Sequence, residues 1–175
     1  ALDRDDQARA EQSLVGFAIQ GRDGAYLLAW NGKRDGDAWK ESVRFPMSGS
    51  RKCFPHAMAR YNGRLYVGWP SVYSFDGAEW SYAGVPVEPE DQLQTHCLAI
   101  FQGGLIAGTW PRAKVARYAG GEKWEEIGRV GQDGTEVNSL VVYNGKLYGG
   151  SIPRAELCRF DGQPQWTMLR RFYSP

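Results

Sequence analysis

The chain has 175 residues, of which 42% are apolar and 23% charged, an ordinary globular composition that argues against general disorder. Lysine and arginine number 21 and aspartate and glutamate 20, so the net charge of +1 excludes the basic footprint of a nucleic-acid-binding protein. No apolar run approaches the ~20 residues of a membrane-spanning helix, while 22 glycines and 13% aromatic residues predict tight turns between short strands.

The chain begins with a polar segment, residues 1–12, for which we expect a short helix or a disordered lead. Because residue 1 is Ala rather than Met, we expect the chain to be processed, trimmed or part of a longer protein. An apolar run at residues 14–19 predicts a strand, and the stretch AYLLAWNGKRDGDAW follows and ends at Trp39. Together these stretches form an incomplete copy of a unit that recurs three more times.

The recurring unit starts each time with a polar residue and ends with a Trp. Its fuller copies occupy residues 56–80, 96–124 and 138–166, starting at His56, His96 and Asn138 and ending at Trp80, Trp124 and Trp166. The starts are 40 and 42 residues apart, the terminal Trp residues are 44 and 42 apart, and Trp39 precedes Trp80 by 41. A fixed period of 20–50 residues is typical of solenoids and propellers, so residues 13–175 are predicted to form one repeat domain.

Turn-forming pairs divide each copy into four short strands. Asn62-Gly63 and Asn144-Gly145 follow the first apolar run, and Gly103-Gly104 lies near that place in the middle copy. Asn-Gly between apolar runs is the strongest short hairpin pattern, because both central residues of the turn need positive φ. A second tight turn is predicted before the Trp that opens the fourth strand, at Asp76-Gly77, Gly120-Gly121 and Asp161-Gly162.

The predicted strands are short, and the first is apolar on both sides. The first strand of the first full copy spans residues 57–61, the second strands span 65–68, 105–108 and 147–150, and the third strands span 72–75, 114–118 and 156–160. Strands that are apolar on both faces suit sheets packed against neighbours on both sides. Four antiparallel strands per ~42 residues make the blade of a β-propeller. The sequence therefore predicts an all-β fold, a β-propeller of four-stranded antiparallel blades, three complete and one partial.

The third copy resembles a known propeller repeat. NGKLYGG, then RFD, then Trp166 resembles the kelch motif, with its Gly pair after the second strand and its later aromatic residue and Trp. The resemblance covers residues 55–170 and implies a propeller of the kind found in many binding proteins. The Gly pair is complete only at Gly149-Gly150, and the period is shorter than the ~50 residues of kelch. The repeats are therefore kelch-like but shortened and degenerate, and no copper-ligand pattern of galactose oxidase is recognisable.

The candidate binding face follows from the turn lengths. The connections after strands one and three are tight, so we expect long loops after strands two and four, on the opposite face, where binding residues usually lie. His56, His96 and Asn138 recur at the entrance of the innermost strand, where they would surround the mouth of an axial channel. They either bind a polar ligand or a metal on the axis or satisfy backbone groups at strand starts. Asn in the third copy argues against the metal.

The connection after the second strand repeats two further features. Trp69 and Trp110 each precede a Pro and either offer a flat apolar surface to a sugar or other planar ligand or cover a blade edge. Arg112 and Arg154 suit a carboxylate or phosphate, with an ion pair to Glu156 or a loop acid as the alternative. The Trp that ends each copy is expected to pack between blades.

Catalytic and metal motifs are absent from the sequence. It contains no GxSxG, HExxH, P-loop, GxGxxG or CxxC, so no metal or cofactor is expected and enzymatic activity is not favoured. Cys53, Cys97 and Cys158 favour buried free thiols, with one disulfide as the alternative. The compartment stays open, with a secreted or periplasmic location slightly favoured over the cytoplasm.

These patterns predict a propeller binding module whose long-loop face binds a glycan or other small polar ligand. The alternatives are a protein–protein interaction scaffold and part of a propeller enzyme (lyase, hydrolase or oxidase) with its site at the channel mouth. Kelch-like rings of six or seven blades need roughly 250–300 residues. The chain is therefore a compact four-bladed ring, part of a larger ring that copies or a second chain complete, or part of a longer protein.

Overall fold

The computed structural model describes residues 17–21, 24–30, 39–45 and 55–173, which fall into two units, Ala1–Pro55 and His56–Pro175. The first unit holds a three-stranded antiparallel sheet in the order β1 (Phe17–Gly21), β2 (Gly24–Trp30), β3 (Trp39–Phe45). β1 overlaps the strand predicted at residues 14–19, and β3 begins at Trp39 as the repeat requires. The polar lead predicted at residues 1–12 lies outside the described residues.

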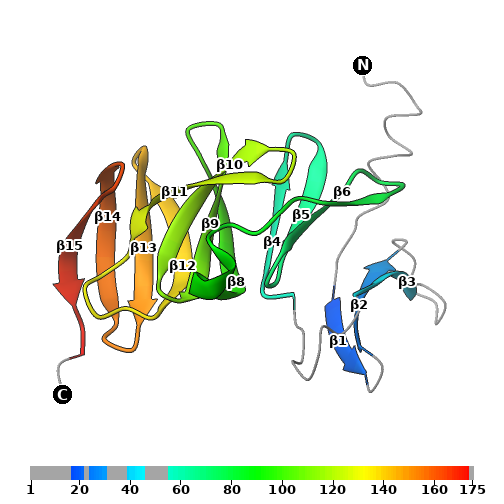
Figure 1. Ribbon diagram of the computed structural model, residues 1–175, viewed down its shortest axis with the longest axis horizontal. Coiled ribbons are helices and arrows are strands. Elements are labelled where there is room, and N and C mark those ends of the chain that lie inside the picture. The colour runs from blue at the N-terminus through cyan, green and yellow to red at the C-terminus, as the bar shows by residue number, and fades with distance from the viewer. Residues whose placement is uncertain (1–16, 22–23, 31–38, 46–54, 174–175) are drawn as a thin grey trace. The chain divides into compact units, whose positions relative to one another are not determined.

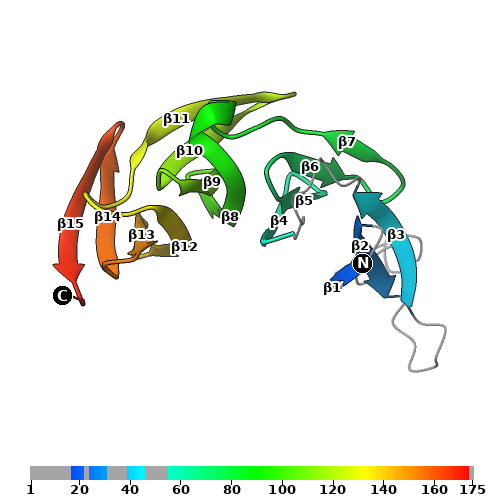
Figure 2. The ribbon, with the colours of Figure 1, turned by 60° about the horizontal axis from the view of Figure 1, so that its bottom comes forward.

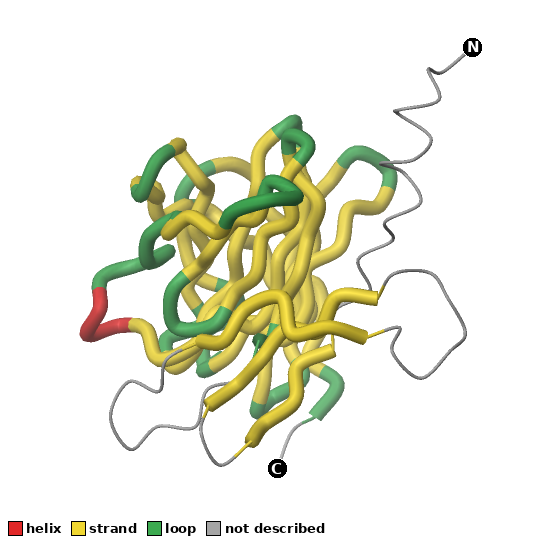
Figure 3. The backbone as a smooth tube through the Cα atoms, turned by 90° about the vertical axis from the view of Figure 1, so that its right-hand side faces the viewer, coloured by secondary structure: helices red, strands yellow, loops and turns green. Residues whose placement is uncertain are grey.

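The second unit consists of three four-stranded antiparallel sheets, each with its strands in chain order (Figures 1 and 3). Blade A contains β4 (Ala57–Tyr61), β5 (Arg64–Gly68), β6 (Val72–Phe75) and β7 (Trp80–Tyr82). Blade B contains β8 (Gln92–Phe101), β9 (Gly104–Pro111), β10 (Lys114–Gly120) and β11 (Lys123–Arg129). Blade C contains β12 (Glu136–Tyr143), β13 (Lys146–Ile152), β14 (Glu156–Gly162) and β15 (Gln165–Arg171). A one-turn 3-10 helix, η1 (Pro89–Asp91), precedes β8. The predicted all-β architecture of four-stranded antiparallel blades is confirmed.

The hairpin turns after the first strands have the backbone that the sequence predicts. Asn62 and Gly63 have φ of 47° and 75°, and Asn144 and Gly145 have 47° and 71°. In blade B the turn residues are Gln102 and Gly103, because Phe101 pairs with Gly104 across the hairpin. The predicted Gly103-Gly104 turn is therefore one residue too late, since Gln102 takes the positive φ that Asn takes in blades A and C.

The second tight turn lies one residue later than expected in blade B and two residues later in blade C. Gly120 and Gly162, with φ of 100° and 113°, belong to β10 and β14 at register irregularities rather than to the turns themselves. The turns are formed by residues 121–122 and 163–164. In these two blades the positive φ that favours glycine is needed at the register irregularity beside the turn.

Neighbouring blades pack face to face, and this packing forms the two cores of the unit. We call the face of a blade toward the next blade in the chain its front and the opposite face its back. Between blades A and B lie Ala59, Tyr61, Tyr66, Val72 and Ala83 of A and Leu98, Leu105, Tyr118 and Trp124 of B. Between blades B and C lie Cys97, Phe101, Ile106, Ala113, Val115, Ile127 and Val130 of B and Val137, Leu140, Leu147, Cys158, Phe160 and Trp166 of C. The first strands β4, β8 and β12 are adjacent, with β7 and β11 on the outer side (Figure 2).

The Trp that ends each copy joins its blade to the preceding one. Trp124 Nε1 donates a hydrogen bond to the carbonyl of Ala83 at 2.7 Å, and Trp166 Nε1 donates to the carbonyl of Ile127 at 3.2 Å. In both pairs the acceptor lies three residues after the Trp of the preceding blade. The regular Trp interval therefore comes from one inter-blade contact made twice, as the sequence predicts for blade packing.

No helix of the described residues has the length and apolar character needed to cross a membrane.

Candidate functional site

The starts of the inner strands bring the three recurring polar residues side by side. His56 directly precedes β4, His96 lies in β8 and Asn138 lies in β12. The rings of His56 and His96 stack with their centroids 4.7 Å apart and their planes 18° apart. His96 Nδ1 lies 3.5 Å from Asn138 Oδ1. The three side chains therefore form one continuous row across blades A, B and C, which we call the polar row.

Two residues that the sequence analysis missed complete this row. Gln94 Oε1 lies 2.6 Å from His96 Nε2, and Glu136 Oε2 lies 3.3 Å from His96 Nδ1. Gln94 and Glu136 each stand two residues before the row residue of their blade and are 42 residues apart, so the repeat spacing could have indicated them. They were missed because β8 and β12 begin earlier than the predicted strands, at Gln92 and Glu136.

The environment of His56 favours its neutral form. Desolvation lowers the pKa of His56 below its usual 6.5, and the neighbouring His96 lowers the pKa further because two imidazolium charges repel each other. A neutral imidazole offers one donor and one acceptor. With Asn138, whose amide also offers both, the row can bind a group that donates and accepts hydrogen bonds.

The geometry does not favour a metal or a reactive thiol. No cluster of three or more His, Cys, Asp or Glu suitable for a metal occurs within residues 17–21, 24–30, 39–45 and 55–173. Cys97 and Cys158 are free thiols, and Cys97 Sγ donates to the carbonyl of Val137 at 3.1 Å. Burial raises the pKa of Cys97 to about 12 and also raises the pKa of Cys158, so both stay protonated at neutral pH. Cys53 lies outside the described residues.

The two Trp residues of the predicted planar site differ in exposure. Trp69 is only 6% exposed, so its ring presents little surface to a ligand. Trp110 is half-buried and pairs with Gln94 across the β8–β9 ladder. The expected long loop after the second strand is wrong in all three blades, because only residues 69–71, 112–113 and 153–155 separate the second strand from the third.

The two predicted arginines also have different surroundings. Arg112 is 67% exposed at its side chain, and its Nε lies 3.7 Å from Asp91 Oδ1. This contact is the surface pair with a loop acid that the sequence left as an alternative. Arg154 is half-buried, and its carbonyl accepts a hydrogen bond from the amide of Tyr173 at 3.3 Å. Among the residues that the structure describes, Arg112 lies beside an acidic residue and Arg154 forms no ion pair.

The predicted partner Glu156 instead forms a buried ion pair with Arg171. The Glu156 side chain is fully buried, Arg171 Nε donates to its Oε1 at 3.2 Å, and Ser151 Oγ donates to its Oε2 at 3.3 Å. Arg171 also donates to Asp133 Oδ2 at 2.9 Å. Residue 133 belongs to the connection between blades B and C, so this network anchors that connection and leaves Glu156 fully engaged.

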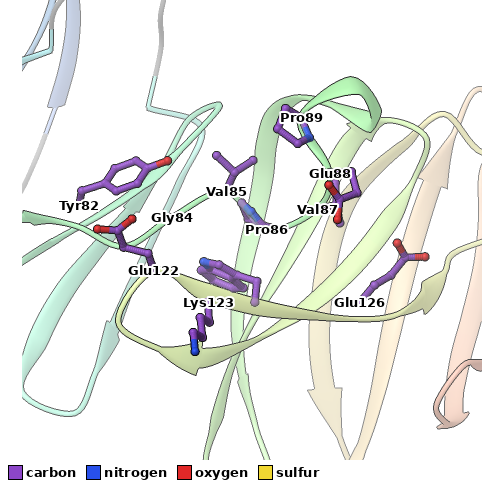
Figure 4. A pocket seen from close by; sticks show the side chains of 11 residues that line it. Tyr82, Gly84, Val85, Pro86, Val87, Glu88, Pro89, Glu122, Lys123 and Glu126 are labelled. Atoms are coloured by element: carbon purple, nitrogen blue, oxygen red, sulfur yellow. The ribbon is translucent and has the colours of Figure 1, made fainter.

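A pocket of about 490 Å³ lies between the β7–β8 connection and β11, away from the polar row (Figure 4). Its lining includes three acids, Glu88, Glu122 and Glu126, and the base Lys123. Glu126 is already paired with Lys114 at 2.8 Å, and Asp91 pairs with the same lysine at 2.7 Å. The acidic run at residues 88–91 thus supplies Glu88 and Pro89 to the pocket wall and Asp91 to an ion pair.

Comparison with known proteins supports the fold alone. Neither a protein-family model nor a curated protein matches the chain. It is similar to the computationally designed Ika8 protein, with a TM-score of 0.52 and 12% identity over 87% of this chain and 47% of that chain. It is also similar to YCF48, a β-propeller whose structure was solved bound to D1 peptide, with a TM-score of 0.55 and 15% identity over 90% of this chain and 56% of that chain.

This chain thus spans about half the length of these two solved structures. The comparisons support a propeller-like fold and give no support to the kelch family or to a glycan ligand.

Proposed function

We propose that this chain is a propeller binding module that holds a polar peptide segment of a partner protein across the polar row. The observation that supports this most is the alignment of His56, His96 and Asn138 over three adjacent blades, with His56 and Asn138 exposed. The spacing of the row follows from blade packing, so the row is a rigid ligand surface that needs little ordering on binding.

The chemistry of the row suits a peptide main chain. Peptide N–H groups would donate hydrogen bonds to Glu136 and to the Asn138 amide oxygen. Peptide carbonyls would accept hydrogen bonds from His56 and the Asn138 amide nitrogen. Arg112, exposed on the same face, suits a carboxylate of the peptide. YCF48 was solved bound to a peptide, which makes this ligand class reasonable for a propeller.

A glycan is the second candidate, and the half-buried Trp110 is the observation that favours it. Sugar binding to a flat aromatic ring needs an exposed face. Trp69 offers little exposed surface, so one half-buried ring would have to carry most of the stacking. The peptide is therefore the ligand we favour.

The test is selection from a random peptide library on the immobilised chain, followed by titration of the selected synthetic peptide. We expect His56→Ala and Asn138→Ala to weaken binding by about tenfold or more, ~1.4 kcal/mol each. The control Lys123→Ala lies at the start of β11, on the tight-turn face, and should leave the affinity unchanged. Equal loss of affinity in all three variants would contradict the proposal. So would a chain that binds no peptide but binds glycans on an array, with glycan binding weakened by the substitutions in the polar row.

A further inference from the structure

The junction between blades A and B is hollow at its outer side, where the pocket of about 490 Å³ lies (Figure 4). We call this hollow the rim pocket, and its lining includes Tyr82, Val85, Pro86, Glu88, Glu122 and Trp124. A volume of roughly 300–1,000 Å³ is typical of ligand pockets. The rim pocket borders the outer strands β7 and β11, whereas the polar row lies on the inner strands, so the two sites are separate.

The sequence explains why this junction is hollow while the next one is bridged. Between blades B and C, Gln163 Nε2 crosses to β11 and donates to the carbonyl of Glu126 at 3.0 Å. The equivalent residue of blade B is Gly121, since both stand three residues before the Trp of their blade. Glycine has no side chain to reach Tyr82, which corresponds to Glu126 in blade A and lies in the pocket wall. The β7–β8 connection, residues 83–91, is also longer than the β11–β12 connection, so space is left between these two blades.

The rim pocket carries negative charge that its neighbours do not neutralise. Glu126, at one end, is already paired with Lys114 at 2.8 Å. Glu88 and Glu122 are exposed, and neither forms an ion pair with another residue that the structure describes. Figure 4 shows the Lys123 side chain pointing away from both of these carboxylates. The pocket therefore offers two carboxylates to a ligand, and a cationic group complements them.

The wall between the two carboxylates is apolar and aromatic. In the view of Figure 4, Val85 and Pro86 lie between them. The indole of Trp124 is half-buried and is fixed by its hydrogen bond to Ala83 and by Tyr118, whose ring centroid is 5.0 Å away. A guanidinium has a flat face that stacks on aromatic rings and donors that pair with carboxylates. This wall therefore suits arginine better than the compact, strongly hydrated ammonium of lysine.

We propose that the rim pocket binds an arginine-bearing segment of a partner protein. Charge complementarity with Glu88 and Glu122 selects a basic segment, and the aromatic and apolar wall selects arginine over lysine. The pocket volume accommodates an arginine side chain together with its neighbours in the segment. This site is additional to the polar row, so the chain would bind partners at its outer strands as well as at its inner strands.

The test measures binding of a fluorescein-labelled Gly-Arg repeat peptide to the whole chain by fluorescence anisotropy. The salt concentration is ~0.15 M, at which distant charges are screened. Glu88→Gln and Glu122→Gln should each raise the dissociation constant by about fivefold, as for a partly exposed ion pair, and the double variant by about twentyfold. Glu125→Gln is the matched control, because it removes the same charge from an exposed position of β11 outside the pocket lining. It should change the dissociation constant by less than about twofold.

A Gly-Lys repeat peptide of the same length and charge separates arginine recognition from general attraction, and it should bind about fivefold more weakly. Three results would overturn the proposal. These are no binding of the Gly-Arg peptide at about 1 mM, equal affinity for the two peptides, and equal loss of affinity in Glu122→Gln and Glu125→Gln. The substituted glutamates are exposed, so circular dichroism melts of the variants should match that of the wild-type chain.

Discussion

The front faces of blades B and C present the same repeat positions in two environments. Blade B has Phe101 and Ile127 against blade C, and blade C has Tyr143 and Leu169 exposed. The residue types hardly differ, and all four are large and apolar or aromatic. Blade C therefore carries the packing residues of blade B at positions that no described residue covers. The same substitution can therefore be compared on a covered blade face and on an exposed one.

The largest difference is expected for truncation of the aromatic residue that ends the first strand. Phe101→Ala should lower the free energy of unfolding by about 3–5 kcal/mol, because it empties a packed site between blades. Tyr143→Ala should lower it by less than about 0.5 kcal/mol, as for an exposed residue. Denaturant titration of both variants at the same low protein concentration measures the difference. Similar losses would show that the two faces are equally covered.

A smaller difference is expected at the glycine of the second strand. A Cβ on Gly108 would lie 2.6 Å from Cys97 Sγ and 2.7 Å from Val137 Cβ. Gly108→Ala should therefore destabilise the chain by about 1–3 kcal/mol through overpacking between blades.

At the equivalent Gly150, a Cβ would meet only Ser139 Oγ, at 2.6 Å, and that hydroxyl can rotate away. Gly150→Ala should be close to neutral when unfolding is followed in the same denaturant titration. If both variants are equally destabilised, a backbone requirement rather than the neighbouring blade selects glycine here.

These glycines and aromatic residues also show how much of the fold could be predicted from the sequence. The strands of residues 57–61 and 72–75 were predicted with their observed bounds, because paired turn signals flank them. The turn at Gln102 was missed, because Gln gives no sequence sign of positive φ. The extension of β8 and β12 was missed because Gln92, Gln94 and Glu136 are polar, and that of β9 because Trp110 stands next to Pro111. Hydrogen bonding across the ladder lengthens these strands.

The candidate site was predicted less completely than the fold. His56, His96 and Asn138 were found because they recur at the repeat interval, and their proximity follows from the adjacency of the inner strands. Gln94 and Glu136 differ in charge and were not recognised as one position. Burial of Trp69 and the pairing of Glu156 with Arg171 depend on packing between segments far apart in the chain, which composition and spacing do not encode.

The ion pairs at the start of the third strands extend the comparison to electrostatics. Glu156 in blade C is buried with Arg171, whereas Lys114, at the same position of blade B, pairs with Asp91 and Glu126 near the surface. Glu156→Gln should cost about 1–2 kcal/mol, because a charge-assisted hydrogen bond is weakened inside the protein. Lys114→Gln should cost less than about 1 kcal/mol, the range of surface pairs. Urea titrations of the two variants measure both losses of unfolding free energy. A larger loss for Lys114→Gln than for Glu156→Gln would mean that Arg171 finds a new buried partner.

The smallest effect is expected at the polar row, where blades A and B meet through two stacked imidazoles. The pKa of His56 lies below 6.5 through desolvation first and the charge of His96 second. A base whose folded-state pKa is lowered binds protons more weakly in the folded state, so its contribution to stability is unimpaired above pH 6.5 and declines as the pH falls through that value. In an NMR titration of the ring protons, His96→Asn should move the His56 midpoint upward but leave it below 6.5, because desolvation stays. A midpoint that does not move would mean that the stacked pair carries no mutual charge effect.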